Sequence, residues 1–162
     1  MNYLKLALVL TALAGCSPSE EGTLQPEQAG NPNHFKPGGD VKYMMQWVLD
    51  PAADHVWDSS GSIITAAGTR ELAPTTDEGW LAVQHSAAVV AETGNLLLLP
   101  SLTKDDKAWK DIAQGLIDAG LRAKAAAAAQ DDEALFDAGG QIYRVCKSCH
   151  SIYVQDEDVP TP

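Results

Sequence analysis

The chain has 162 residues and a formal net charge of −11, and 45% of its residues are hydrophobic. An acidic surplus of this size repels phosphates, which excludes nucleic acid as the expected partner. It favours steering toward a partner protein with a basic surface, although a solvated acidic surface explains the charge equally well.

Residues 1–16, MNYLKLALVLTALAGC, have the pattern of a bacterial export signal. Lys5 precedes an apolar run over residues 6–14 that is too short to span a bilayer as a permanent helix. The run ends in LAGC, which resembles the lipobox of bacterial lipoprotein precursors, where cleavage precedes the cysteine and the cysteine carries the lipid. We therefore expect residues 1–15 to be a lipoprotein signal peptide and Cys16 to be lipidated. The alternative is an ordinary secretory signal with a chance cysteine.

Residues 16–39 are expected to be the lipidated cysteine and a flexible tether. Residues 17–39 contain few large apolar side chains and many Pro, Gly and polar residues. They cannot bury enough apolar surface to offset the entropy of ordering. Ser17 stands where aspartate signals retention at the inner membrane in lipoproteins of the enterobacterial type. By that resemblance, Ser17 favours the periplasmic side of the outer membrane, with the inner membrane as the alternative.

Residues 40–162 are long enough for one hydrophobic core and too short for two. No stretch shows the alternation of a strand, and apolar residues recur at helical spacing instead. The first helical segment begins near Asp40, a suitable N-cap, and Pro51 makes it either one kinked helix or two short ones. Its expected inner stripe consists of Val41, Met45, Val48, Ala52 and Val56.

Three further helices follow in the predicted order. Residues 59–76 are predicted to be a long connection, residues 77–94 a second helix, and residues 95–100 an apolar loop ending at proline. The third helix is predicted to open at Ser101 or Thr103, with acidic residues in its first turn. Its expected inner face is Trp109, Ile112, Leu116, Ala119, Ala123 and Ala126.

The fourth helix is predicted to start at Asp131 and Asp132. Four helices joined by loops predict an all-α fold, with an antiparallel four-helix bundle as the default arrangement. The inward residues of the last helix follow a heptad-like spacing of 4, 3, 4, 3 and 4, which places both of its cysteines on the stripe facing the other helices. These residues are Leu135, Gly139, Ile142, Cys146, Cys149 and Tyr153.

The motif CKSCH contains Cys146, Cys149 and His150, and it admits three kinds of chemistry. A structural zinc site needs four ligands, whereas the motif supplies three. A thioredoxin-like redox pair belongs at the start of a helix after a strand, where the helix dipole lowers the thiol pKa. Covalent haem fits best, because two thiols one turn apart can add across two vinyl groups and the next histidine can bind the iron.

With CKSCHSIY on its last helix and VKY at the start of its first, the chain resembles the class II cytochromes c, the cytochrome c-prime group. The resemblance covers roughly residues 40–155 and implies that the domain of residues 40–162 is a four-helix domain with one covalent haem c on the last helix. It implies that Cys146 and Cys149 form the thioethers and that His150 is the proximal iron ligand. Tyr153 matches the CHxxY pattern of the group, whereas Val154 replaces the basic residue that often follows.

The resemblance leaves the distal side of the iron open. In c-prime members an apolar side chain of the first helix blocks that side, and in six-coordinate relatives a methionine of the first helix binds the iron. Here Met44 follows VKY where the group has arginine, and Val48 occupies the distal position. We expect Met45 to be the distal ligand. Met44, His55 and an open, apolar-capped site are the alternatives.

Four tryptophans are expected to lie in the core or against the macrocycle, and His85 is expected to be structural. The tryptophans are Trp47, Trp57, Trp80 and Trp109.

From these features we expect a lipid-anchored monohaem electron carrier that faces the periplasm and is not an enzyme. Its expected partners are a redox protein with a basic surface and the membrane, which it contacts through its lipid. A homodimer of two copies of the chain is a further possibility. The alternative is five-coordinate, c-prime-like binding of nitric oxide or carbon monoxide, and a third reading is a lipoprotein without haem. No residue pattern argues for hydrolytic or transferase catalysis.

Overall fold

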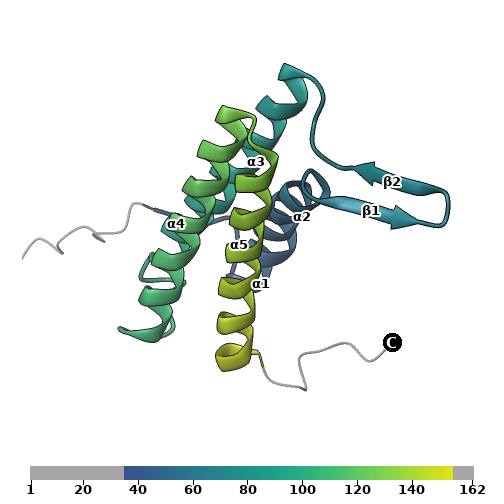
Figure 1. Cartoon of the computed structure of the whole chain (residues 1–162). Coiled ribbons are helices and arrows are strands. Elements are labelled where there is room, and N and C mark those ends of the chain that lie inside the picture. The colour runs from purple at the N-terminus through teal and green to yellow at the C-terminus, as the bar shows by residue number, and fades with distance from the viewer. Residues whose placement is uncertain (1–34, 155–162) are drawn as a thin grey trace, which may run out of the picture. The chain divides into compact units, whose positions relative to one another are not determined.

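The structure, a computed structural model, describes residues 35–154, so the expected signal peptide, Cys16 and most of the expected tether lie outside the described residues. The described part is mostly helical, with four helical segments and one small two-stranded sheet (Figure 1). The first segment consists of α1 (Val41–Met44), the π-helical turn η1 (Met45–Leu49) and α2 (Asp50–Asp58). No helix of the described part is both long and apolar enough to cross a membrane.

The first segment begins where the sequence predicts. The Asp40 carboxylate accepts a hydrogen bond of 2.9 Å from the Tyr43 N–H, which confirms Asp40 as the N-cap. The helix then passes Pro51 without breaking, through a widened turn in which the Asp50 N–H donates to the Met45 carbonyl. Because proline lacks an N–H and crowds the carbonyl four residues earlier, a π-turn directly before Pro51 accommodates it. The extra residue in this turn changes which side chains face inward.

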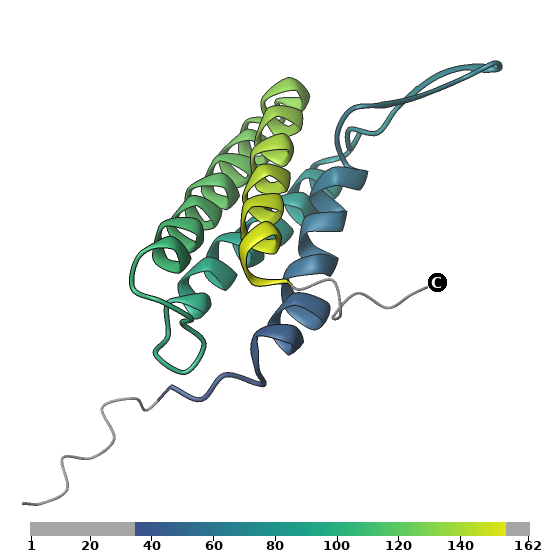
Figure 2. The ribbon, with the colours of Figure 1, turned by 90° about the horizontal axis from the view of Figure 1, so that it is seen from below.

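The connection over residues 59–76 contains strands, so the prediction of a connection without strands is wrong. Strand β1 (Ser62–Thr65) pairs antiparallel with β2 (Gly68–Glu71), and the hairpin projects from the helices (Figure 2). Every residue of both strands is exposed. A hairpin without a buried face has no reason to alternate apolar and polar residues, which is why periodicity misses it.

Helices α3 (Asp77–Leu97) and α4 (Ala108–Ala129) differ from the prediction at one end each. Helix α3 starts at the expected residue, where Thr76 accepts from the Gly79 N–H, and runs beyond Gly94 into the expected apolar loop. Helix α4 starts later than Ser101 or Thr103. Asp105 lies before it and accepts from the N–H groups of Lys107 and Trp109 at 2.9 and 3.1 Å.

Helix α5 (Asp132–Tyr153) starts as predicted, since the Asp131 carboxylate accepts from the Ala134 N–H at 2.9 Å. Its predicted inward stripe is confirmed. Leu135, Gly139 and Ile142 are buried, and Cys146, Cys149 and Tyr153 are half-buried. The inner face predicted for α4 is also confirmed, with Ile112 half-buried and the other five residues buried.

Helices α3 and α4 approach each other closely because small residues line their contact. A Cβ atom at Gly120 would lie 2.6 Å from the Ala91 nitrogen, and one at Gly94 would lie 2.6 Å from Cγ1 of Ile117. Glycine is therefore required at both positions for this approach. The buried alanines of α4 are Ala113, Ala119, Ala123, Ala126 and Ala127.

The tryptophans divide into three environments. Trp80 and Trp109 lie in the core, as expected, and Trp57 is half-buried. Trp47 is 70% exposed, so the prediction that it lies in the core is wrong, whereas its contact with a haem stays a prediction. Trp47 lies on the outer side of the first segment, because the residues that face inward there are Met44, Met45 and Leu49.

Two glycines of α4 give a matched test of this packing. Gly120→Ala should lower the free energy of unfolding by about 1–3 kcal/mol, because the added methyl meets the backbone of α3. Gly115→Ala should raise it by about 0.5–1 kcal/mol, because its Cβ would lie 3.5 Å from Cγ2 of Val145 and alanine favours the helix. Urea unfolding measures both, and equal shifts in the two variants would contradict the close contact.

Candidate functional site

A cavity of about 530 Å³ lies between the first helical segment and α5, with α3 and α4 behind it. This volume falls within the range of about 300–1,000 Å³ typical of small-molecule and cofactor sites. Its deep wall consists of the buried apolar residues Leu97, Ala113 and Leu116. Among its other lining residues, Asp50, Tyr143, Lys147, His150 and Ser151 are exposed and mark the mouth. The cavity therefore has an apolar interior and a polar rim.

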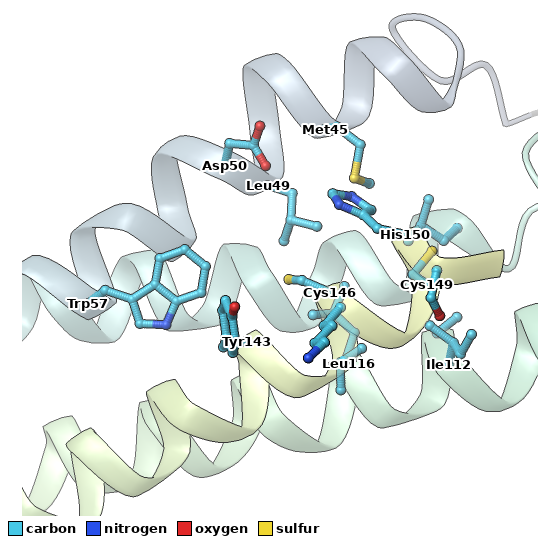
Figure 3. A pocket seen from close by; sticks show the side chains of 15 residues that line it. Met45, Leu49, Asp50, Trp57, Ile112, Leu116, Tyr143, Cys146, Cys149 and His150 are labelled. Carbon is cyan, nitrogen blue, oxygen red and sulfur yellow. The ribbon is translucent and has the colours of Figure 1, made fainter. Parts of the chain in front are cut away.

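The α5 wall of the cavity carries the CKSCH motif. Cys146 and Cys149 lie one helical turn apart, are half-buried, and are both free thiols. His150 is exposed at the rim, and its ring points across the cavity (Figure 3). All three predicted residues of the motif thus line one cavity.

The opposite wall comes from the π-turn and supplies Met45 and Leu49. Figure 3 shows the Met45 sulfur and the His150 ring pointing toward one another from the two walls. Met44 does not line the cavity and is only 3% exposed, so it belongs to the core. Leu49 lines the cavity, whereas Val48, the distal position in the family pattern, does not. The π-turn accounts for this shift, because it places residues four and five apart on one face.

His55 and His85 do not line this cavity. The His55 ring lies 2.7 Å from the Ser86 hydroxyl on α3, within hydrogen-bonding distance. His85 is exposed on α3. The structure therefore brings together His150 and Met45, and it leaves His55 on the side of the first segment that faces α3.

The electrostatic environment keeps both thiols protonated. Burial raises the pKa of Cys146 to about 11, and the nearby Asp50 carboxylate and Cys149 add to the effect. Burial also raises the pKa of Cys149. A redox-active thiol pair needs the opposite shift, because the thiolate is the nucleophile. Among residues 35–154, no group of three or more His, Cys, Asp or Glu side chains is arranged to hold a metal ion.

Two aromatic contacts hold α5 against the rest of the molecule, and the first lies at its N-terminal half. The Trp57 indole N–H donates to the Gly139 carbonyl at 2.9 Å. The Trp57 ring also meets the Tyr143 ring edge-on, with centroids 6.4 Å apart. A Cβ at Gly139 would lie 3.1 Å from Trp57, so a glycine there admits the indole. Because Trp57 and Tyr143 also line the cavity, this contact forms one end of it.

The second contact lies at the C-terminal end of α5. The Tyr153 ring meets the buried Trp109 ring edge-on, with centroids 5.0 Å apart, and the Tyr153 hydroxyl donates to the Asp105 carboxylate. The Trp109 indole donates to the Leu97 carbonyl at 2.7 Å. The Tyr153 hydrogen bond lowers the pKa of Asp105 and raises the pKa of Tyr153 to about 12. This second contact fixes the turn of α5 that carries Cys149 and His150.

Sequence reasoning missed several residues of the site. Leu49, Asp50 and Lys147 line the cavity without having been assigned to it. Burial and the nearby Asp54 charge raise the pKa of Asp50, an effect that His150 opposes. The signal that could have found Leu49 and Asp50 is Pro51, since proline in a helix predicts a local change of register.

No protein-family model, curated protein or solved structure matches this chain. The assignment of a function therefore depends on the cavity and on the residues that line it. The cavity is apolar, with two protonated thiols and an imidazole on one wall and a thioether on the other. These are the kinds of side chain that hold a covalent haem.

Removal of one hydroxyl tests the second aromatic contact. Tyr153→Phe should destabilise the protein at neutral pH, because Asp105 then loses the hydrogen bond that favours its charged form. A carboxyl whose folded pKa is depressed contributes stability above its unfolded pKa, near 4, and loses it as the pH falls through the folded pKa. The deficit should therefore be present at pH 7 and shrink below about pH 4.

Tyr143→Phe is the matched control, because it removes a hydroxyl from an exposed tyrosine of the same helix. Thermal unfolding from pH 2.5 to pH 8 measures both variants. A deficit of Tyr153→Phe that is independent of pH, or equal to that of Tyr143→Phe, would contradict the role of the Asp105 contact.

Proposed function

We propose that this chain is a lipid-anchored, periplasm-facing c-type cytochrome with one haem, and that it acts in electron transfer. The observation that carries the proposal is the convergence of Cys146, Cys149 and His150 on one wall of an apolar cavity, with Met45 on the opposite wall. The proposal includes the arrangement of the helices as an antiparallel four-helix bundle with the haem on the last helix.

Cys146 and Cys149 would hold the group covalently. Each S–H would add across one vinyl group, forming a carbon–sulfur bond while the proton goes to the other vinyl carbon, so the step needs no oxidant. The raised pKa values of both thiols support this role. A low thiolate fraction slows disulfide closure in an oxidising compartment and leaves both sulfurs available.

His150 and Met45 would bind the iron from opposite sides. Haem c, when bound, supplies one-electron transfer between ferric and ferrous iron, and a methionine ligand raises its reduction potential. Leu49 and Leu116 line the same space with apolar side chains, which would limit the access of water to the bound iron. Exclusion of water lowers the local dielectric, which also tunes the potential.

The acidic surplus of the chain supports a partner protein with a basic surface. Attachment through Cys16 would keep the domain at the membrane, on the periplasmic side of the outer or inner membrane. Two copies of the domain would be able to associate without changing this role.

A second function has one observation in its favour. Leu49 is an apolar side chain of the first segment and lines the same wall as Met45. If Leu49 covers the iron and Met45 does not bind it, the site is five-coordinate and suited to nitric oxide or carbon monoxide. The two functions therefore differ in whether Met45 binds the iron.

Substitution of neighbouring methionines separates them. The unchanged protein should show low-spin optical bands in both redox states and a methionine–iron absorption near the red end of the ferric spectrum. Met45→Leu should lose that absorption and shift the reduction potential downward. Met44→Leu should keep both, because Met44 lies in the core and leucine nearly conserves its volume.

A Met45→Leu spectrum identical to that of the unchanged protein would contradict ligation by Met45. High-spin bands in the unchanged protein, with rapid binding of carbon monoxide to the ferrous state, would support the gas-binding function instead.

A further inference from the structure

A separate hollow of about 280 Å³ lies on the surface where α5 meets the end of α2. Three aromatic rings line it. Trp57 comes from α2, whereas Phe136 and Tyr143 lie seven residues apart on α5, which places both on one face of that helix. We call this hollow the aromatic notch, and its other lining residues are Ser60, Gly139 and Gly140. Its volume lies below the range of about 300–1,000 Å³ typical of cofactor sites, so a single side chain is a more suitable occupant.

The two α5 rings of the notch are open to solvent although they are large. Phe136 and Tyr143 are each 59% exposed. Trp57 is half-buried, and its indole N–H already donates to the Gly139 carbonyl, so it has no free hydrogen-bonding group to offer. Single exposed apolar side chains are ordinary, but aromatic surface that gathers around one hollow is typical of an interaction site.

The floor of the notch contains two adjacent glycines in the middle of α5. A Cβ atom at Gly139 would lie 3.1 Å from the Trp57 ring, so packing within the chain explains this glycine. A Cβ atom at Gly140 would meet only Nη1 of Arg144, at an ordinary contact distance of 3.6 Å. No contact within the chain therefore requires glycine at position 140. Its missing side chain leaves the backbone of α5 open at the notch, where a bound group can approach it.

The surroundings of the notch are acidic. Asp132 and Glu133 line an adjoining hollow that shares Phe136 with the notch, and Asp137 directly follows Phe136. None of these three carboxylates takes part in the ion pairs found over residues 35–154. Arg144, the basic residue near the floor, lines a different hollow between α4 and α5. The charge beside the notch is therefore complementary to a cation.

We propose that the aromatic notch receives an arginine side chain of a basic partner protein. A guanidinium group stacks on aromatic rings and is attracted by carboxylates, and the notch offers both. A second copy of this chain is a poor occupant, because its acidic surplus would be repelled by Asp132 and Glu133. The identification of the partner as a redox protein rests on the proposed function, whereas the recognition of arginine rests on the notch alone.

The place of the notch suits such a partner. Trp57 and Tyr143 also line the large cavity, so the notch lies directly beyond one end of it (Figure 3). Their rings meet edge-on, with centroids 6.4 Å apart. A protein bound at the notch would thus lie against the two rings that close the cavity in which we place the haem.

The experiment is a calorimetric titration of the purified protein at low and constant ionic strength. Its probe is a short synthetic peptide of arginine and glycine, compared with the same peptide containing lysine. The arginine peptide should bind saturably and roughly fivefold more tightly than the lysine peptide, because lysine carries the same charge without the stacking plane. The measurement has no redox readout. Absence of haem, judged by the optical spectrum, would therefore remove the proposed function without removing arginine binding.

Two pairs of variants locate the binding. Phe136→Ala should weaken binding of the arginine peptide about fivefold, whereas Leu121→Ala, which removes an exposed apolar side chain from α4, should not change it. Gly140→Ala should weaken it by a similar factor, whereas Gly115→Ala should not. Both glycine variants should have a raised melting temperature, because alanine favours the helix, so unfolding cannot explain a loss of binding. Glu133→Gln should weaken binding and reduce its dependence on salt.

Four outcomes would overturn the proposal. The first is no saturable binding of the arginine peptide. The second is equal affinity for the lysine peptide, which would mean that only charge matters. The third is binding that survives Phe136→Ala or is weakened equally by Leu121→Ala. The fourth is a dimer in analytical ultracentrifugation that Phe136→Ala dissociates, because a second copy of the chain would then cover the notch.

Discussion

The position of α5 depends on two tryptophan side chains that reach it from different helices. Trp57 donates to the Gly139 carbonyl near one end of the helix, and Trp109 meets the Tyr153 ring near the other. Between these contacts α5 faces the first helical segment across an apolar cavity rather than packing directly against it. Rigid groups with few rotatable bonds hold such a separation at low entropic cost. The presentation of Cys146, Cys149 and His150 follows from this arrangement.

Much of the fold follows from local rules. Periodicity and caps predict the four helical segments, the start of the first at Asp40 and that of the last at Asp131, because these depend on neighbouring residues alone. The hairpin at Ser62–Glu71 has no buried face, so the pattern that reveals strands is absent from it. The late start of α4 at Ala108 reflects Asp105, which lies before the helix and accepts hydrogen bonds from the N–H groups of Lys107 and of Trp109 in the first turn. Sequence rules predict that such an acidic residue lies near the start of a helix, but they do not predict at which residue the helix begins.

The candidate site divides in the same way. The heptad-like stripe of α5 predicts that Cys146 and Cys149 face inward, and both line the cavity. Helical periodicity also predicts that Met45, and not Met44, faces the cavity. The place of Leu49 on the wall, where Val48 was expected, follows from the π-turn before Pro51. Sequence predicts a disturbance at a proline, but only the three-dimensional structure shows that one extra residue is taken up there.

The central claim is that the two thiols of α5 carry a haem, and mass spectrometry of the proteolytic peptides of the protein purified from bacterial membranes tests it most directly. After denaturation and treatment with an alkylating reagent, the account predicts a mass increase of one haem on the peptide that contains Cys146 and Cys149, with neither thiol alkylated. A peptide without haem, alkylated at both Cys146 and Cys149, would contradict it.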